Sequence, residues 1–313
     1  MTRLALFAIA AAVLLACSCQ LLADEPILDP QFELKKAVSD CKFTEGPAMD
    51  SHGNLYFSDG RNNRIMRLTP EGELSEFRKP SGRANGLLID HQDRLLMCQS
   101  SGDGGGRRVT RLEADGSETV LAAEYEGKPF IAPNDLAIDV QGRIFFTDPW
   151  YGPPAEKSQS TAGVYRIDAP GKVKRVISNL ERPNGILVTA DSRQLLVSDR
   201  FTQKLHRYTF DEAGELIPDG VVYDFSPDRG IDGMWLDREG NIYGAAGEGK
   251  TTGLFVISPQ GKLLLHKPMP EFSTNVVIGG KDGRDLYLTA TTSVYQMRTI
   301  RPTAKLPPVP KAD

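Results

Sequence analysis

The sequence is poor in the residues that bind soft metals, and it lacks long basic or apolar runs along most of its length. Only four cysteines and four histidines occur in 313 residues, and no cysteine–histidine spacing typical of a zinc site is present. The net charge is −4 and no stretch is rich in lysine or arginine, which argues against nucleic acid as a partner. A single N-terminal apolar run is too short to span a membrane, so the sequence excludes an integral membrane protein.

That apolar run extends from Leu4 to Ala16 and follows a basic residue. This is the pattern of a signal peptide, which we place at residues 1–23. Two processing routes are open. Cys17 ends a lipobox-like sequence and would then carry a lipid anchor, the only membrane attachment that we expect; alternatively, ordinary cleavage follows Ala23. Either route predicts an exported protein that is periplasmic, secreted or lipid-anchored.

One pattern recurs six times along the rest of the chain. A polar residue opens an apolar strand, a small residue usually follows, and a tight turn leads to a second apolar strand. The opening residues lie about 40 to 50 positions apart: Glu45, Asn85, Asn134, Asn184, Asp232 and Asn275. Strand repeats of this length are the signature of a β-propeller. We therefore predict an all-β, six-bladed β-propeller over residues 31–298.

The first copy defines the strands that we expect in a blade. They are Gly46–Asp50, Leu55–Asp59, Arg64–Leu68 and Leu74–Phe77. The sixth copy has only three such segments before a proline-rich tail at residues 299–313, which we expect to be loosely ordered. An alternating segment, Phe32–Val38, is left unassigned at the other end. We predict that this N-terminal strand completes the last blade and closes the ring without an unpaired edge.

The first strand of each propeller blade lines the central channel, so the six opening residues are expected to form a ring at one mouth of it. Four of them offer oxygen donors that could converge: Glu45, Asn134, Asn184 and Asp232. Two carboxylates and two amide carbonyls suit a hard divalent cation such as Ca²⁺, and the absence of histidine and cysteine from the ring argues against zinc. The alternative is that these residues only cap strands or begin turns.

Longer connections on the same face are expected to wall the channel mouth. The longest is Pro149–Gly163, which contains Trp150 and Tyr151. These two aromatic residues either stack on a substrate or pack the connection onto its blade. At the ends of second strands, Asp148 and Asp199 approach the same mouth, where they are either architectural or orient the metal ligands from behind.

Five short motifs occur in order along the chain: Phe43-Thr44-Glu45-Gly46-Pro47, Pro133-Asn134-Asp135-Leu136, Phe146-Thr147-Asp148-Pro149, Arg182-Pro183-Asn184-Gly185 and Ile231-Asp232-Gly233-Met234. They resemble the gluconolactonase / senescence marker protein (regucalcin) family. The resemblance covers about residues 40–298 and implies a six-bladed propeller with one catalytic divalent cation and lactone hydrolysis as the usual activity. The sequence departs from the animal proteins at Ala132, where they carry an arginine that helps to hold substrate.

By that resemblance, Glu45, Asn184 and Asp232 match the core metal ligands. Asn134 matches a residue that contacts metal in some members and substrate in others, and Asp232 also matches the proposed general base. If a bound cation weakens Asp232 as a base, Asp199 or Asp148 is the alternative.

The resemblance also implies a cofactor and a substrate. We expect one divalent cation, Ca²⁺ first, with Mg²⁺, Mn²⁺ and Zn²⁺ as the other candidates, and a small sugar lactone whose carbonyl the cation polarises. The alternatives are an exported binding or scaffold propeller with a structural Ca²⁺, or a hydrolase of another lactone or ester. We expect a monomer or a weak dimer.

Overall fold

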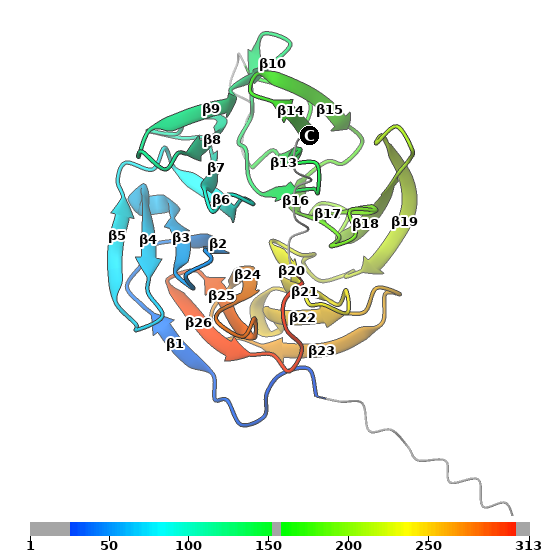
Figure 1. Cartoon of the computed structure of the whole chain (residues 1–313). Helices are drawn as coiled ribbons and strands as arrows, with labels where there is room; N and C mark the ends of the chain where they lie inside the picture. Colours follow the sequence, from blue (N-terminus) through cyan, green and yellow to red (C-terminus); the bar gives the residue numbers. More distant parts are fainter. Residues whose placement is uncertain (1–25, 152–157, 305–313) are drawn as a thin grey trace, which may run out of the picture.

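Six four-stranded antiparallel sheets are arranged as blades around a common axis (Figure 1). The computed structural model describes residues 26–151 and 158–304, so the predicted signal peptide at 1–23, with Cys17, lies outside the described residues. Within them, no helix has the length and apolar character needed to cross a membrane. The prediction of an all-β, six-bladed propeller is confirmed.

Each of the first five blades contains four consecutive strands. Blade one consists of β2 (Thr44–Met49), β3 (Leu55–Asp59), β4 (Arg64–Leu68) and β5 (Leu74–Arg78). Blade two consists of β6 (Ala84–Ile89), β7 (Leu95–Gln99), β8 (Arg108–Leu112) and β9 (Glu118–Ala122). Blade three consists of β12 (Leu136–Ile138), β13 (Ile144–Asp148), β14 (Gly163–Ala169) and β15 (Lys172–Ile177).

Blade four consists of β16 (Pro183–Val188), β17 (Gln194–Asp199), β18 (Lys204–Phe210) and β19 (Leu216–Asp224). Blade five consists of β20 (Met234–Leu236), β21 (Ile242–Ala246), β22 (Gly253–Ile257) and β23 (Leu263–Pro268). A hairpin of β10 (Glu124–Tyr125) and β11 (Lys128–Pro129) lies between blades two and three, and the short 3₁₀ helices are η1 (Gly60–Asn62) and η2 (Gly249–Thr251).

The sixth blade combines the two ends of the chain. Its strand order is β1 (Lys35–Val38), β26 (Ser293–Arg298), β25 (Asp285–Ala290) and β24 (Ser273–Gly279). The outer strand β1 pairs antiparallel with β26, with Lys35 opposite Gln296. This strand begins three residues later than the predicted segment Phe32–Val38, because only its second half pairs with the sheet.

The turn between the first two strands of a blade is closed by an aspartate side chain. In blade one, Oδ1 of Asp50 accepts hydrogen bonds from the backbone N–H groups of His52 (3.0 Å) and Asn54 (2.8 Å), and Gly53 takes a positive φ of 86°. Asp237 closes the corresponding turn of blade five in the same way. An aspartate that folds back on its own backbone favours a turn over continued strand, which explains the regular spacing of the repeats.

Side-chain hydroxyls on the second strands of blades one, three and four fasten each of these blades to the next. Ser58 donates to the carbonyl oxygen of Asn85 (2.8 Å), Thr147 to that of Asn184 (2.8 Å) and Ser198 to that of Ile231 (2.7 Å). Each acceptor is an opening residue or the residue before one. The second strands therefore fix the backbone from which the ring of polar residues projects.

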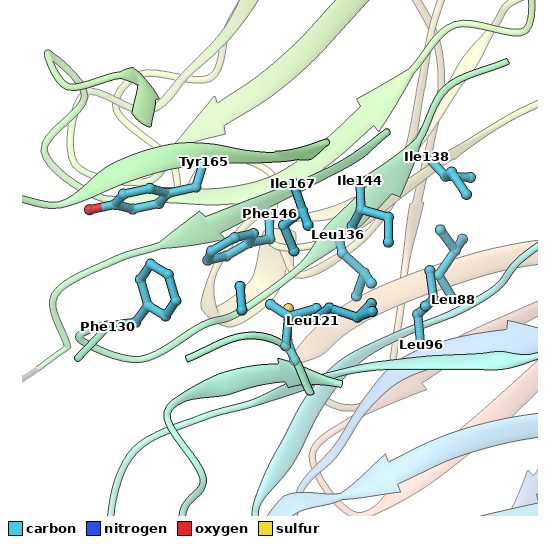
Figure 2. Packing of buried hydrophobic residues seen from close by; sticks show 13 residues of the cluster. Leu88, Leu96, Leu121, Phe130, Leu136, Ile138, Ile144, Phe146, Tyr165 and Ile167 are labelled. Atoms are coloured by element: carbon cyan, nitrogen blue, oxygen red, sulfur yellow. The ribbon is translucent and has the colours of Figure 1, made fainter. Parts of the chain in front are cut away.

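The core consists of apolar layers between neighbouring blades. Figure 2 shows the cluster between blades two and three, where Leu96 and Leu121 face Leu136 and Phe146. The ring of Phe130, in the connection between these blades, packs edge-to-face on Phe146 with a centroid separation of 4.9 Å. Burying a side chain of this size contributes about 1.5–3 kcal/mol, so each interface helps to hold its two blades in a fixed orientation.

The first part of the C-terminal tail is ordered and packs beside blade five. The backbone N–H of Ala304 donates to the Leu236 carbonyl (3.0 Å), and that of Arg238 donates to the Pro302 carbonyl (2.9 Å). The indole Nε1 of Trp235 donates to Oγ1 of Thr303 (2.7 Å). The expectation of loose order is therefore wrong as far as Ala304, because backbone hydrogen bonds hold this segment; the rest of the tail lies outside the described residues.

Candidate functional site

Polar residues at the starts of the inner strands are buried together at one mouth of the propeller. Glu45, Asn134, Asn184, Asp232 and Asn275 are between 2% and 7% exposed. Charged and amide groups are rarely buried unless they have partners or a ligand. The contacts among them therefore indicate what the site can hold.

Asp232 is the most heavily contacted member of this group. Its Oδ1 accepts a hydrogen bond from Nδ2 of Asn184 at 2.5 Å, and its Oδ2 accepts one from Nη1 of Arg229 at 2.7 Å. Nη1 of Arg200 lies 3.6 Å from the same Oδ2. The carboxylate thus lies between an amide on one side and two guanidinium groups on the other.

Glu45 supplies a second buried carboxylate. Burial raises the pKa of Glu45 well above its usual range, and the negative charge of Asp232 raises it further. The backbone N–H of Gly46 donates to Oε2 of Glu45 (3.0 Å) and opposes this effect. Two like charges in one buried site repel each other, and a cation between them would relieve that repulsion.

Asp135 and Asn275 extend the cluster towards the interior. Burial raises the pKa of Asp135 to about 7; the Leu136 N–H opposes this rise, and the charge of Asp232 adds to it. The Asn275 side chain contacts the carboxylates of both Asp135 and Glu45. A Cβ on Gly233 would lie only 1.9 Å from the Asn275 side chain, so this position has room for glycine alone.

The predicted ligand Asn134 is buried, but in the part of the chain that the structure describes it makes no hydrogen bond with the other three. Its backbone carbonyl accepts from the Gly86 N–H at 2.7 Å, whereas its side-chain amide has no hydrogen bond to any other residue in the described ranges. The structure therefore brings Glu45, Asn184 and Asp232 together, and it leaves the Asn134 amide available for a ligand.

The two aromatic residues of the long connection behave differently. Trp150 packs against the small apolar cluster of Ile131, Ala132 and Ala162. The ring of Tyr151 is 46% exposed at the mouth, and its hydroxyl accepts a hydrogen bond from the amide of Asn184. Desolvation of that hydroxyl raises the pKa of Tyr151, and the charge of Asp232 adds to the rise. Tyr151 reaches the site, whereas Trp150 anchors the connection to its blade.

Asp148 and Asp199 hold the loops that precede two of the opening residues. The oxygens of Asp148 accept from the backbone N–H groups of Ile131 (2.9 Å) and Ala132 (2.6 Å), ahead of Asn134. Those of Asp199 accept from the N–H groups of Glu181 and Arg182, ahead of Asn184. They also accept from the Phe201 N–H and the Thr202 hydroxyl in the turn that follows Asp199.

Asp59 repeats the arrangement ahead of Glu45. Its Oδ1 accepts from the backbone N–H groups of Lys42 (3.0 Å) and Phe43 (3.2 Å), which stand three and two positions before Glu45. Three blades thus use one buried carboxylate to fix the loop from which a site residue projects.

The arginines at Asp232 were not predicted from the sequence. Arg229 is 5% exposed; beyond Asp232 it donates to the carbonyl oxygens of Gly247 and Ser273, both at 2.7 Å. Blade five has Ala246 where blades one, three and four have the loop-holding aspartate. That departure from the repeat is the signal that a different residue, here Arg229, anchors this loop.

The donor set fits a hard cation only if the amides contribute. Among the described residues, no group of three or more histidine, cysteine, aspartate or glutamate side chains is arranged to hold a metal ion. Glu45 and Asp232 offer two carboxylates, and Asn134 and Asn184 offer amide oxygens. Half a turn of the Asn184 amide exchanges its Nδ2 for its Oδ1. Carboxylates, amide carbonyls and water are the ligands that Ca²⁺ and Mg²⁺ accept.

Comparison with known proteins gives the family. A gluconolactonase from Zymomonas mobilis is 28% identical over 88% of this chain and 83% of its own length. The pentonolactonase XacC of Haloferax volcanii is 27% identical over 80% of this chain and 81% of its own length. The solved structure of a gluconolactonase from Xanthomonas campestris has 27% identity and a TM-score of 0.78, and the match covers 87% of this chain and 91% of that one. The model of the SMP-30/Gluconolactonase/LRE-like region matches residues 43–292, so the chain belongs to that family.

Proposed function

We propose that this protein hydrolyses a sugar lactone to the open-chain hydroxy acid, with a divalent cation bound by Glu45, Asn184 and Asp232. The observation that carries the proposal is the buried pair of carboxylates, Glu45 and Asp232, at the mouth of a propeller of the SMP-30/gluconolactonase family. The relatives named gluconolactonase and pentonolactonase support the substrate class.

Ca²⁺ is the cation that we favour. The candidate donors are all oxygens, and among the residues that the structure describes neither histidine nor cysteine belongs to the cluster, which favours a hard ion over zinc. Asn134 would complete the donor set or contact the substrate. When bound, such a cation supplies Lewis-acid polarisation of the lactone carbonyl.

Asp232 is the base that its position favours, because it lies in the buried cluster together with Glu45 and Asn184. Asp148 and Asp199 accept backbone N–H groups of the loops behind the cluster. In the proposed reaction, water attacks the carbonyl carbon and Asp232 takes its proton. The bond between the carbonyl carbon and the ring oxygen then breaks, and the ring oxygen receives the proton to become a hydroxyl group.

Two further groups prepare the site for this step. The hydroxyl of Tyr151 accepts from the Asn184 amide, and because a phenol can also donate, it can hold this side chain after the amide has turned its Oδ1 towards a cation. Arg200 places a positive charge 3.6 Å from Oδ2 of Asp232, and a fixed positive charge at the site would stabilise negative charge that develops on a substrate oxygen. Both roles depend on preorganised charge rather than on a further proton transfer.

Metal-free protein tests the proposal directly. We would follow acid release from glucono-1,5-lactone, corrected for spontaneous opening, while Ca²⁺, Mg²⁺, Mn²⁺ and Zn²⁺ are added back separately. We expect metal-dependent hydrolysis that is lost in Asp232→Asn and kept in Asp219→Asn, which alters an exposed carboxylate on the outer strand β19. Metal binding without hydrolysis of this or other sugar lactones would instead favour a binding propeller.

A further inference from the structure

A cavity at the surface adjoins the buried cluster and has two arginines in its wall. It has a volume of about 220 Å³ and opens between blades one and two, beside Glu45. Its walls include Phe43, Arg61, Arg83, Asn85 and Ser100. Because Glu45 belongs to both the cavity and the carboxylate cluster, a ligand bound at the cluster can extend into this space.

Neither arginine of the cavity has a carboxylate partner among the residues that the structure describes. In the described ranges, no ion pair or side-chain hydrogen bond to an acidic group involves Arg61 or Arg83. Other arginines of the same two blades are paired: Arg64 lies 3.0 Å from Asp59, and Arg78 lies 2.6 Å from Glu118. Arg67 and Arg107 of the same blades also have no carboxylate partner in the described ranges, but neither lines the cavity, and Arg107 donates instead to the carbonyl oxygens of Phe130 and Ile131.

The local structure holds Arg83 in position. Its φ of +55° is a left-handed conformation that non-glycine residues seldom adopt, and it is fixed by hydrogen bonds on both sides. Its N–H donates to Oδ1 of Asn63 at 2.7 Å, and its carbonyl accepts from the Ser100 N–H at 3.1 Å. A Cβ at Gly102 would come within 3.1 Å of the Arg83 Nε, so this glycine gives the guanidinium room.

Arg61 reaches the same cavity from η1. Its guanidinium carbon lies 5.2 Å from the centroid of the Phe43 ring, which is within the range of a cation–π contact. The contact leaves the N–H edge of the guanidinium free to bind another group. The only carboxylate in the cavity wall is Glu45, which we propose to be a metal ligand.

We propose that this cavity binds an anionic group, a carboxylate or a phosphate, carried by the substrate on the carbon chain outside the lactone ring. Two guanidinium groups in the wall of one cavity favour such a group because arginine forms paired, charge-assisted hydrogen bonds with carboxylate and phosphate oxygens. The inference rests on the proposed lactonase function and narrows it to lactones with a second acidic group, such as those of sugar diacids or sugar phosphates.

Binding of open-chain acids tests the cavity without depending on catalysis. We would measure the affinity of the Ca²⁺-loaded protein for gluconate, which has one carboxylate, and for glucarate and 6-phosphogluconate, which have a second anionic group. We expect at least one of the two dianionic acids to bind roughly tenfold more tightly than gluconate, since a charge-assisted hydrogen bond supplies that much. Whichever is preferred identifies the group as carboxylate or phosphate.

Variants of the two arginines test whether the preference for dianionic acids arises in this cavity. Arg83→Gln and Arg61→Gln should abolish the preference while gluconate still binds, and Arg207→Gln, which breaks a pair with Asp219 on the surface of blade four, should keep it. Equal affinity for all three acids, or a preference that survives in both cavity variants, would overturn the inference.

The lactones of the same acids separate this inference from the proposed function. Hydrolysis of glucono-1,5-lactone without any preference for acidic lactones would support the proposed lactonase function and overturn the proposal that the substrate carries a second acidic group. Suppose instead that dianionic acids bind more tightly than gluconate, that this preference requires the two arginines, and that no lactone is hydrolysed. That result would support the anion-binding cavity and overturn the proposed lactonase function.

Discussion

Nη1 of Arg229 lies 2.7 Å from Oδ2 of Asp232, and the two side chains are only 3% and 6% exposed. The buried arginine thus pairs with the carboxylate that we propose as both metal ligand and base. Oδ2 of Asp232 is therefore paired with the arginine, whereas Oδ1 faces Asn184. Metal affinity at this site should therefore depend on a residue that is not itself a ligand.

Replacing Arg229 with methionine should separate the effect of this arginine on stability from its effect on metal affinity. Without metal, the variant leaves Asp232 buried without its closest cation, which costs about 3–5 kcal/mol of stability. Its affinity for Ca²⁺ should rise roughly tenfold, because one positive charge beside the site has been removed. Thermal unfolding with and without Ca²⁺, together with calorimetric titration, measures both. If Arg229 only anchored the loop, Ca²⁺ affinity would fall together with stability, and Arg229→Lys would restore it only in part.

Gly46 tests how closely the inner strands pack. Its φ is +48°, and an added Cβ would lie 2.1 Å from the Asn85 carbonyl oxygen. Gly46→Ala should lower the free energy of unfolding by more than about 2 kcal/mol, because strain and a backbone clash combine. Gly249 has a similar φ of +58° with no atom within 4 Å of the added Cβ, so Gly249→Ala measures the conformational strain alone. If urea denaturation shows equal losses of unfolding free energy in Gly46→Ala and Gly249→Ala, the explanation by close packing is contradicted.

Asp59→Ala should destabilise the fold although the residue lies behind the site. Asp59 is fully buried, and it accepts hydrogen bonds from Asn62 (2.7 Å) and Arg64 (3.0 Å) as well as from two backbone N–H groups. We expect a loss of about 3 kcal/mol, since several donors lose their acceptor at once. Ca²⁺ affinity should also fall, because the loop ahead of Glu45 is released. Asp219→Ala, on the surface, is the control; similar unfolding midpoints for both variants would contradict this prediction.

The pH dependence of stability should reveal Asp148. Burial raises its pKa from 3.8 to about 7, although the Ile131 and Ala132 N–H groups oppose the rise. Between these pH values the folded protein keeps a proton that the unfolded chain releases. The contribution of Asp148 to the free energy of unfolding therefore falls as the pH rises from about 4 to about 7.

Asp148→Asn cannot titrate, so its stability should change less over this interval than that of the wild type. Urea unfolding of the metal-free proteins at several pH values measures the two slopes. Because the comparison uses slopes, a constant loss from weaker hydrogen bonds in the variant does not affect it. Parallel slopes would show that Asp148 is already ionised at low pH.

The repeats made most of the fold predictable. The predicted strands Leu55–Asp59 and Arg64–Leu68 coincide with β3 and β4, because strand alternation and turn residues act locally. Local rules also located Glu45, Asn184 and Asp232 at equivalent positions of their blades. The hairpin β10–β11 was not predicted, since it occurs once and breaks the repeat.

The electrostatic partners of the site were harder to predict. Arg229 and Arg200 come from loops of different blades, and no periodicity connects them with Asp232. The two interpretations of Trp150 also depended on tertiary packing: the sequence contained no sign that its ring would contact Ile131 and Ala132. The contacts of a residue that does not recur in the repeat cannot be predicted from the repeat and become visible only in the folded chain.

The two ends of the described chain meet on the same blade. Leu28 and Thr299 form an antiparallel bridge, and the N–H of Ile300 donates to the Ile27 carbonyl at 3.1 Å. The described backbone therefore forms a nearly closed ring, because its first and last residues lie next to each other. A circular permutant that joins the residues near Ile27 and Thr299 and begins instead at the exposed Glu212, in a hairpin turn of blade four, would retain every sheet. The order of the blades along the described chain could therefore be rotated without altering the site.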